Sequence, residues 1–324
     1  MTSSLQLFTF LLAVVTLVAG LAYRRAWIRM RGDAVTPTGF GALLALALLA
    51  ASLVFQLPTS ISIAFGIIAG ATALYWLDDL QELSARLRMA VSFATGVAIC
   101  WLLLKDNAGI PVWLMVLACA LAGGVNVVLT NIINFYDGAD LNLATVIALT
   151  AIGLLWLAGD SREMVVSAMA CLGFIAPFAI MNSRPKTIYL GDAGSFAFAC
   201  LLTMMTVICL REPGGLTPAV AVPLALPAFD TFYVFCVRMI EKHDLLTRNY
   251  LHLYQKLNTH RPGFVYLAPQ VVNAVLVLGV FTLLQKAGVN LFLAVLIAGA
   301  GVTIPFYFLC RRFLLPRSAQ AAGS

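Results

Sequence analysis

Acidic and amide side chains recur at the ends of long apolar segments in this 324-residue chain. The pair Asp78-Asp79 ends one segment, and two further groups occupy residues 131–140 and 182–195. Asp230 lies late in another segment and precedes a basic loop that contains His252. Carboxylates at a membrane interface do not stabilise a lipid-embedded protein. A charged, metal-bound substrate, however, would require them. The clusters therefore predict an active site.

The composition indicates an integral membrane protein. The chain is 62% hydrophobic and 10% charged, whereas soluble domains are roughly 25% charged. A spanning helix needs roughly 20 apolar residues, and alternating ten-residue blocks typical of a membrane barrel are absent. We expect a single domain, 1–324, of all-α polytopic fold. Eleven spans are expected, at 4–23, 39–57, 61–77, 88–104, 111–130, 142–158, 164–181, 196–210, 217–237, 265–283 and 290–310.

The distribution of basic residues predicts the orientation. With eleven spans, the loops on one side hold 16 of the 20 Lys and Arg residues, and the positive-inside rule makes that side cytoplasmic. The N-terminus is then outside and the C-terminus cytoplasmic. The first span is expected to be a retained helix, because arginines follow it and a small-residue cleavage site is missing. All four polar clusters fall on the cytoplasmic side. The active-site loops expected there are 24–38, 78–88, 131–141, 182–195 and 238–264.

The adjacent acids Asp78 and Asp79 are more than a solvated helix end. Anionic side chains near a helix C-terminus oppose the macrodipole, and neighbouring helical residues point about 100° apart. We therefore expect the two carboxylates to have different partners, such as a cation and a polar or basic side chain.

The run from Asn131 to Asp140 predicts a helix that ends near residues 134–137 and then turns. Steps of three lose about 60° each on a helix, so a continuous helix would separate the polar side chains. Gly138 is a natural break. The turn would gather Asn134, Asp137 and Asp140.

Residues 182–195 combine Asn182 and Tyr189 with the string Gly191-Asp192-Ala-Gly194-Ser195. The two glycines would let backbone N–H groups approach an oxyanion, and Ser195 is expected to cap the following helix. Asp192 would repel a bare phosphate, so a divalent cation is expected between them.

The fourth cluster joins Asp230 to the loop that follows it. An ionisable residue at membrane depth is usually functional or paired, and Arg238 is one candidate partner. All three histidines of the chain, His252 among them, lie in the loop. A solvated basic loop would account for Lys256 and Arg261, but not for the histidines.

A basic, carboxylate-rich site suits two anionic substrates, one soluble and one lipidic. Two unit charges about 4 Å apart repel by roughly 4 kcal/mol at an effective dielectric near 20. Joining a phosphate to a diphosphate therefore requires cations, usually Mg²⁺ held by carboxylates together with Arg and Lys.

The motifs and their order resemble the polyprenyl-phosphate N-acetylhexosamine-1-phosphate transferases, glycosyltransferase family 4. They are D-D, N-x-x-N-F-x-D-G-x-D, N-x-x-P-x-x-x-Y-x-G-D-x-G-S and P-x-x-D-T, and they span about residues 35–260. The resemblance implies transfer of an amino-sugar 1-phosphate from a UDP-sugar to undecaprenyl phosphate, with release of UMP, in the bacterial inner membrane. It implies Mg²⁺ as the cofactor, with Mn²⁺ as an alternative ion. It implies that no nucleic acid is bound, and it leaves open whether the protein forms a homodimer.

The resemblance also implies residue roles. Asp192 matches a Mg²⁺ ligand, with Asp79 as a second ligand. Asp78 and Asp79 match an essential acidic pair, although the general base is left open. Arg238 and His252 match positions near the phosphates and the sugar, and His252 is taken as catalytic.

A second set of residues is implied to bind the nucleotide-sugar. Asp137 and Asp140 match uridine-pocket residues, and Tyr189 matches an aromatic residue that stacks on uracil. Asn134 and Asn182 match polar residues near the nucleotide-sugar.

Two positions depart from the family pattern. The last loop usually reads D-x-x-H-x-H-H, but here Tyr254 and Gln255 replace two histidines, which resembles O-antigen initiators that use 6-deoxy amino sugars. The resemblance implies that the sugar is GlcNAc or a 6-deoxy HexNAc such as FucNAc or QuiNAc. Asn142 stands where the family usually has glycine. The alternative function is a transporter or flippase for an anionic lipid-linked or nucleotide substrate, although internal repeats and mid-span acids are missing.

Overall fold

The computed structural model describes residues 2–32, 35–81, 83–107, 109–157, 161–183, 187–211, 222–242, 251–261 and 263–316. All regular elements in these ranges are helices, which confirms the expected all-α fold. The chain divides into two compact units, Met1–Val220 (unit 1) and Ala221–Ser324 (unit 2). The sequence predicts that the whole chain acts as one transferase domain, and this stays a prediction.

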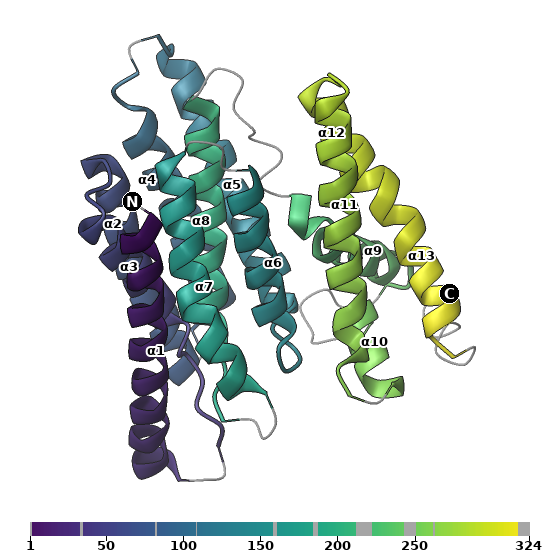
Figure 1. Ribbon diagram of the computed structural model, residues 1–324, viewed down its shortest axis with the longest axis horizontal. Helices are drawn as coiled ribbons and strands as arrows, with labels where there is room; N and C mark the ends of the chain where they lie inside the picture. The colour runs from purple at the N-terminus through teal and green to yellow at the C-terminus, as the bar shows by residue number, and fades with distance from the viewer. Residues whose placement is uncertain are drawn as a thin grey trace. The chain divides into compact units, whose positions relative to one another are not determined.

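Unit 1 is a bundle of helices that run side by side (Figure 1). Its helices are α1 (Thr2–Arg31), α2 (Ala42–Val54), α3 (Thr59–Leu80), α4 (Ala85–Leu104), α5 (Val112–Phe135), α6 (Asn142–Leu157), α7 (Arg162–Asn182) and α8 (Gly191–Arg211). Helix α8 packs against α2, α3, α4 and α5, and 89% of its most apolar window is buried. A helix that is apolar on every side is typical of a position in the interior. The core of unit 1 is therefore built around α8.

Unit 2 consists of α9 (Ala225–Ile240), α10 (Leu253–His260), η2 (Val265–Leu267), α11 (Ala268–Lys286), α12 (Leu291–Leu296), η3 (Ile297–Val302) and α13 (Thr303–Leu314). The last three elements follow one another without a break and form one long apolar span, Leu291–Leu314. Helices α9, α11 and α13 pack together, and the short α10 lies against η2.

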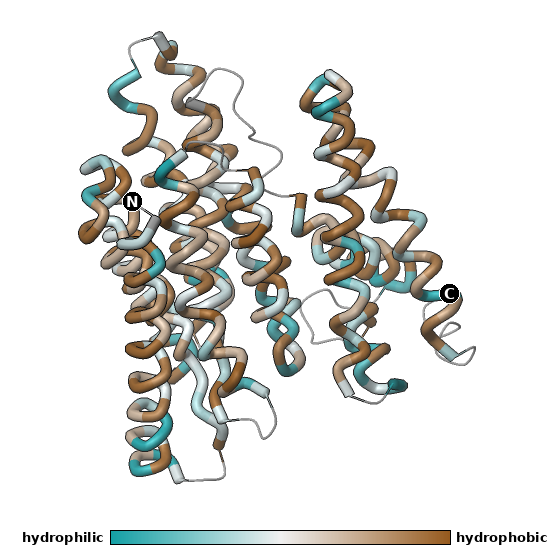
Figure 2. Tube along the Cα trace, in the orientation of Figure 1, coloured by the Kyte–Doolittle hydropathy of each residue, from teal (hydrophilic) through white to brown (hydrophobic). Residues whose placement is uncertain are grey.

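Most of the described helices are apolar enough to cross a bilayer (Figure 2). Nine of them in the described ranges also have sufficient length, so the chain is a multi-pass membrane protein. The predicted spans 39–57 and 142–158 correspond to the shorter α2 and α6, of 13 and 16 residues. At 1.5 Å per residue these two reach about 20 and 24 Å, less than the roughly 30 Å hydrocarbon core. The count of eleven spans therefore stays a prediction.

Two helices near the polar clusters begin earlier in the chain than the predicted spans do. Helix α8 begins at Gly191, not near residue 196, and α4 begins at Ala85, not 88. Asp192, Gly194 and Ser195 therefore lie in the first turns of α8, not in a loop. The expectation that Ser195 caps this helix is wrong, because Ser195 is its fifth residue and its buried Oγ has no hydrogen-bond partner among the described residues.

Candidate active site at the helix ends of unit 1

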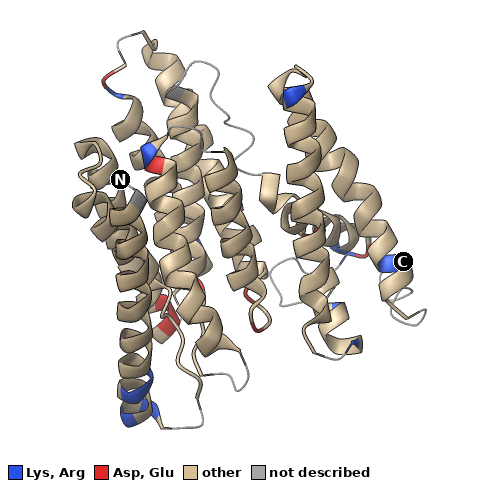
Figure 3. Ribbon diagram, viewed as in Figure 1, with Lys and Arg blue, Asp and Glu red and all other residues tan. Residues whose placement is uncertain are grey.

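Several acidic residues of unit 1 lie towards the end of the bundle at which the basic end of α1 lies, and others lie at the opposite end (Figure 3). Arg31, the last residue of α1, donates from Nη2 to the Leu80 carbonyl at the end of α3, 3.4 Å away. The C-terminal ends of α1 and α3 therefore lie together, as expected for loops on one face of a membrane.

The carboxylates of Asp78 and Asp79, in the last turn of α3, have different partners, as their adjacent helical positions predict. Asp78 is buried and accepts hydrogen bonds from the Leu83 N–H at 2.6 Å and from Arg88 Nη1 at 3.2 Å. Asp79 accepts from the backbone N–H of Asp192 at 3.0 Å and of Ala193 at 3.1 Å. The two acids thus connect α3 to different helices, α4 and α8.

Asp79 caps α8 from outside that helix. The first N–H groups of a helix have no intrahelical acceptor, and a carboxylate there also interacts favourably with the helix dipole. Oδ1 of Asp79 additionally accepts from Thr38 Oγ1 at 3.2 Å. Three of the roughly four lone-pair positions of the carboxylate are thereby used, and about one remains for a further partner.

Glycines allow the backbone to approach this cap closely. Gly191 has φ +78°, and a Cβ there would lie 2.5 Å from Asp79 Oδ1 and from the Gly39 nitrogen. A Cβ on Gly41 would lie 2.2 Å from the Cα of Gly194. The start of α8 therefore tolerates only glycine where it meets the segment before α2.

The segment before α2 runs along the residues that precede α8. Tyr189 donates its backbone N–H to the Pro37 carbonyl at 2.7 Å, and Gly41 donates to the Leu190 carbonyl at 2.8 Å. These backbone bonds place the half-buried Tyr189 beside the capped end of α8.

Arg88 joins two of the acids, and the sequence analysis did not single it out. Its Nη1 donates to Asp192 Oδ2 at 2.8 Å and to Asp78 Oδ2 at 3.2 Å. Arg88 lies in the first turn of α4, after the cap residue Ser84, and a cation there opposes the helix dipole. This unfavourable position of a positive charge could have identified Arg88 from the sequence, because such a charge requires acidic neighbours from elsewhere in the fold.

The turn between α5 and α6 brings a further acid to the group. Helix α5 ends at Phe135, which confirms the predicted break near residues 134–137. Asp137 accepts a hydrogen bond from the backbone N–H of Gly191. Burial, and then the neighbouring carboxylates of Asp192 and Asp79, raise the pKa of Asp137 well above its ordinary value. The acids of this group outnumber the one guanidinium, Arg88, that contacts them among the described residues.

Two asparagines hold this turn in place. Asn182 is buried; its Oδ1 accepts from the Leu141 N–H at 2.6 Å, and its Nδ2 donates to the Ile188 carbonyl at 2.9 Å. Asn142, at the position where the family usually has glycine, donates to the Tyr136 carbonyl at 2.9 Å. The side chain of Asn182 thus ties the α5–α6 turn to the segment before α8, which is a structural role.

The other predicted residues of unit 1 lie around this group. Asn134 is half-buried in the last turn of α5, and Asp140 is half-buried in the α5–α6 turn. Arg184 and Lys186, from the same motif as Tyr189, are outside the described residues.

Unit 2 contains a separate buried cluster around Asp230. Its carboxylate accepts from Tyr307 Oη at 2.8 Å and from the Leu253 N–H at 3.0 Å, and its Oδ2 lies 3.1 Å from His252 Nδ1. His252 is the N-cap residue of α10, and Gln255 Oε1 accepts its backbone N–H at 3.2 Å. Gln255, one of the departures from the family pattern, therefore completes a helix cap.

Arg238 lies buried in the last turn of α9. His243, Arg248 and Asn249, which belong to the predicted last loop, are outside the described residues.

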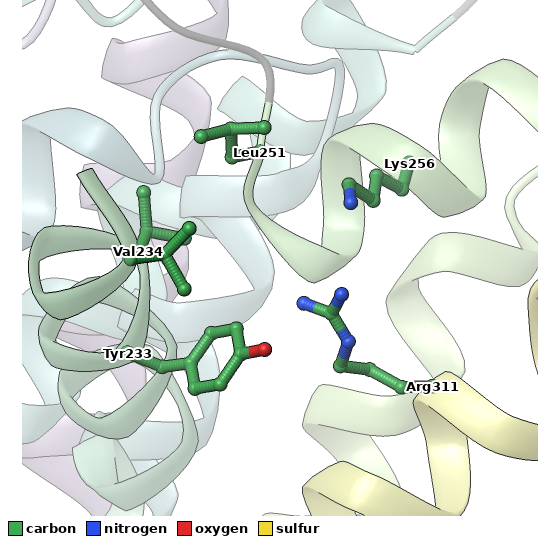
Figure 4. Close-up of a pocket in the computed structure, with 6 residues that line it drawn as sticks. Tyr233, Val234, Leu251, Lys256 and Arg311 are labelled. Atoms are coloured by element: carbon green, nitrogen blue, oxygen red, sulfur yellow. The ribbon is translucent and has the colours of Figure 1, made fainter. Parts of the chain in front are cut away.

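Lys256, which the sequence assigns to a solvated basic loop, is instead buried, so that expectation is wrong. It lies in α10, is 7% exposed, and lines one small pocket together with Tyr233 and with Arg311 of α13 (Figure 4). Arg261, from the same predicted loop, is exposed as expected.

The donor set of unit 1 suits a hard cation. No group of three or more His, Cys, Asp or Glu side chains in the described ranges converges on one point. Mg²⁺, however, is usually held by one or two carboxylates, with water and substrate phosphates completing its octahedron. Asp192 is 27% exposed at its side chain and offers such a carboxylate, and Asp79 retains about one lone pair beside it.

The fold and the site define a multi-pass membrane protein with a carboxylate cluster at the end of a buried helix. The sequence model of glycosyl transferase family 4 matches residues 60–210, which include all the clustered acids of unit 1. A phospho-N-acetylmuramoyl-pentapeptide-transferase from Moorella thermoacetica is 30% identical over 263 residues, which cover 69% of this chain and 78% of that protein. The chain belongs to glycosyl transferase family 4.

Other relatives match over shorter regions. A probable undecaprenyl-phosphate N-acetylglucosaminyl 1-phosphate transferase from Bacillus subtilis is 25% identical over 195 residues, which cover 56% of this chain. The match spans about half, 53%, of that relative's length. A phospho-N-acetylmuramoyl-pentapeptide-transferase from Trichormus variabilis is 30% identical over 174 residues, 46% of this chain and 45% of that protein. These names give the relatives different sugars, and none of them is a transporter.

Proposed function

We propose that this chain transfers an N-acetylated amino-sugar 1-phosphate from a UDP-sugar to undecaprenyl phosphate. A phosphate oxygen of the lipid bonds to the β-phosphorus of the UDP-sugar, the bond from that phosphorus to the bridging oxygen breaks, and UMP leaves. The product is a lipid-linked diphosphate sugar. Family membership and the names of the relatives support this class of reaction.

The observation that carries the proposal is the meeting of four carboxylates and one guanidinium around the start of α8. Asp79 caps the helix, Asp137 accepts from Gly191, and Arg88 bridges Asp78 and Asp192. A structural salt bridge needs one acid for one base, so the surplus of acids points to a cation brought with the substrate.

We propose Asp192 as the principal Mg²⁺ ligand, with Asp79 contributing through its remaining lone pair and Mn²⁺ as a substitute ion. Bound Mg²⁺ would offset the charge on the diphosphate and on the incoming lipid phosphate. Arg88 would then add positive charge beside the same phosphates. Asp78 is assigned to positioning Arg88, since its carboxylate forms a salt bridge with that guanidinium.

The remaining roles follow the family resemblance. Asp137, Asp140 and Tyr189 would form the uridine pocket, with Asn134 near the nucleotide-sugar. Arg238 and His252, in unit 2, would contact the phosphates and the sugar.

We further propose a cytoplasmic active site in the inner membrane, from the excess of basic residues in one set of loops. The sugar is proposed to be GlcNAc or a 6-deoxy HexNAc, and the product to initiate O-antigen or a related envelope polysaccharide. The replacement of two family histidines by Tyr254 and Gln255 supports the 6-deoxy choice.

The test is UMP release by the purified full-length protein with undecaprenyl phosphate, Mg²⁺ and a panel of UDP-sugars. We expect UMP release that depends on the lipid and stops with a chelator. Asp192→Asn should abolish it, whereas Asp106→Asn, an exposed acid in the turn after α4, should not change it.

Each arm has an outcome that contradicts one part of the proposal. Normal turnover by Asp192→Asn would overturn the metal assignment. Much faster turnover of UDP-GlcNAc than of UDP-FucNAc and UDP-QuiNAc would exclude the 6-deoxy choice, and UMP release with none of the sugars would reject the reaction.

A further inference from the structure

Tyr75 of α3 joins the two helices whose side chains form the salt bridge between Arg88 and Asp192. The tyrosine is 4% exposed, and its hydroxyl donates to the backbone carbonyl of Arg88 in α4 at 2.7 Å. Its ring stacks on that of Phe196 in α8, with the centroids 4.0 Å apart and an interplanar angle of 11°. One buried side chain therefore contacts both the α4 turn that carries Arg88 and the α8 turn that follows Asp192.

The contacts of Tyr75 continue those of Asp79. Tyr75 lies four residues before Asp79 on α3, and Phe196 lies four residues after Asp192 on α8. Residues four apart share one side of a helix. Asp79 accepts the first amides of α8, and Tyr75 stacks on that helix one turn further along. The hydroxyl of a buried tyrosine usually finds a partner, and here the partner is the start of α4.

The start of α4 needs contacts from outside the helix. The first N–H groups of a helix have no intrahelical acceptor, and the positive charge of Arg88 is unfavourable there. The cap residue Ser84 accepts the Leu87 N–H at 3.3 Å, in an exposed position. The Arg88 carbonyl can accept the helix amide four residues on, and its second lone pair takes the tyrosine hydroxyl. Tyr75 therefore fixes this turn without disrupting the helix.

Asn126 of α5 makes a second set of contacts with the same side of α4. Ser92 lies four residues after Arg88. The side-chain amide of Asn126 donates to the Ser92 carbonyl at 2.8 Å and to the Ser92 hydroxyl at 3.1 Å. Its Oδ1 accepts from Thr203 of α8 at 2.9 Å, and all three side chains are buried. Hydrogen-bonded polar networks of this kind specify one arrangement of the helices that they join.

We propose that Tyr75 is a positioning residue for Arg88, with Asn126 as a second contact on the same side of α4. Together they place the start of α4 so that the guanidinium lies between Asp78 and Asp192. A guanidinium is a rigid, planar set of donors, so its contacts depend on the position of the backbone that carries it. The effect of Tyr75 on turnover rests on the proposed function, whereas its effect on the salt bridge does not.

The first test is a double-mutant cycle on the melting temperature of the full-length protein in detergent. Tyr75→Phe removes the hydroxyl and keeps the stacked ring. Arg88→Gln should lower the melting temperature less in the Tyr75→Phe background than in wild type, because the salt bridge is already weakened there. Equal shifts in the two backgrounds would overturn the inference, whether or not the protein shows enzymatic activity.

The second test measures kcat for UMP release. Tyr75→Phe should lower kcat by up to about tenfold, which corresponds to the loss of one hydrogen bond. In the Arg88→Lys background the further loss should be less than about twofold, because an ammonium on a flexible stem depends less on the backbone position. A purely structural role of Tyr75 predicts equal losses in both backgrounds, and that result would reject positioning in turnover.

Two further variants complete the design. Tyr233→Phe removes the same hydroxyl from a half-buried tyrosine of α9 in unit 2, and it should change neither the melting temperature nor kcat. Asn126→Ser shortens the second contact with α4, and both tests can be repeated with it if Tyr75→Phe does not fold.

Failure of this inference and failure of the proposed function give different results. UMP release by wild type, together with additive effects in both tests, would remove the inference alone. A non-additive melting-temperature cycle without UMP release from any UDP-sugar would remove the proposed function alone.

Discussion

The carboxylate of Asp79 accepts the backbone N–H of Asp192 at 3.0 Å. An acid at the end of α3 therefore fixes the first turn of α8, and with it the direction in which the Asp192 side chain leaves that helix. The two residues are 113 positions apart in the chain, so this contact depends on the packing of α3 against α8.

Asp79→Ala should lower the free energy of unfolding by about 1 kcal/mol, the usual effect of removing a helix cap, and should abolish UMP release. The first amides of α8 would lose their acceptor, and Asp192 would lose its orientation. Thermal unfolding and the UMP assay measure the two effects. Asp106→Ala is the control, and an unchanged melting temperature in Asp79→Ala would argue against the cap.

Arg88→Gln should destabilise the protein by about 1 kcal/mol, because the salt bridge is partly exposed and screened by solvent. The loss of turnover should be much larger than this, since Asp78 and Asp192 would repel each other without the guanidinium between them. Arg88→Lys should keep part of the activity. Arg86→Gln removes an exposed charge from the same helix turn, and an equal loss in that variant would contradict a specific role for Arg88.

Asn182→Ala should destabilise the protein by about 1–3 kcal/mol, because it leaves the Leu141 N–H and the Ile188 carbonyl without their partner. A residue that only contacted substrate would change KM and leave the melting temperature as it was. Asn131→Ala, which removes an exposed amide at the end of α5, should have little effect on either quantity.

Gly41→Ala should destabilise the protein by about 1–3 kcal/mol, typical of overpacking, because the new Cβ would meet the backbone of Gly194. Gly66→Ala offers a matched comparison within α3, where a Cβ meets nothing within 4 Å. That variant should be about 0.5–1 kcal/mol more stable through helix propensity. Melting temperatures of the pair test the close approach, which is refuted if both variants behave alike.

Asp137 should make the stability of the cation-free protein depend on pH. Its pKa is raised in the folded state by burial and by the carboxylates of Asp192 and Asp79, so folding favours the protonated form. The stabilising contribution is full below the ordinary pKa of about 3.9 and is lost as the pH rises through the raised value.

The comparison with Asp137→Asn isolates this effect. The variant stays neutral, so wild type should lose stability relative to it as the pH rises, in thermal unfolding with chelator present. A difference between the two proteins that is constant across pH would contradict the raised pKa.

The sequence by itself determined the class of membrane protein, the positions of the apolar helices and the residue types of the site. Apolar length and helix-breaking residues are local properties, so the end of α5 and the different partners of Asp78 and Asp79 followed from spacing alone. Family motifs supplied the roles proposed for Asp192 and its neighbours.

Only the tertiary structure decided which groups pair. Arg88 forms a salt bridge with Asp192, and Asn182 connects two segments. Asp79, not Ser195, caps α8. Lys256 is buried beside Arg311. Each of these contacts depends on the packing of helices that are distant in sequence. A hydrogen bond or a buried charge is set by distances of a few ångströms, which the order of residues along one helix does not contain.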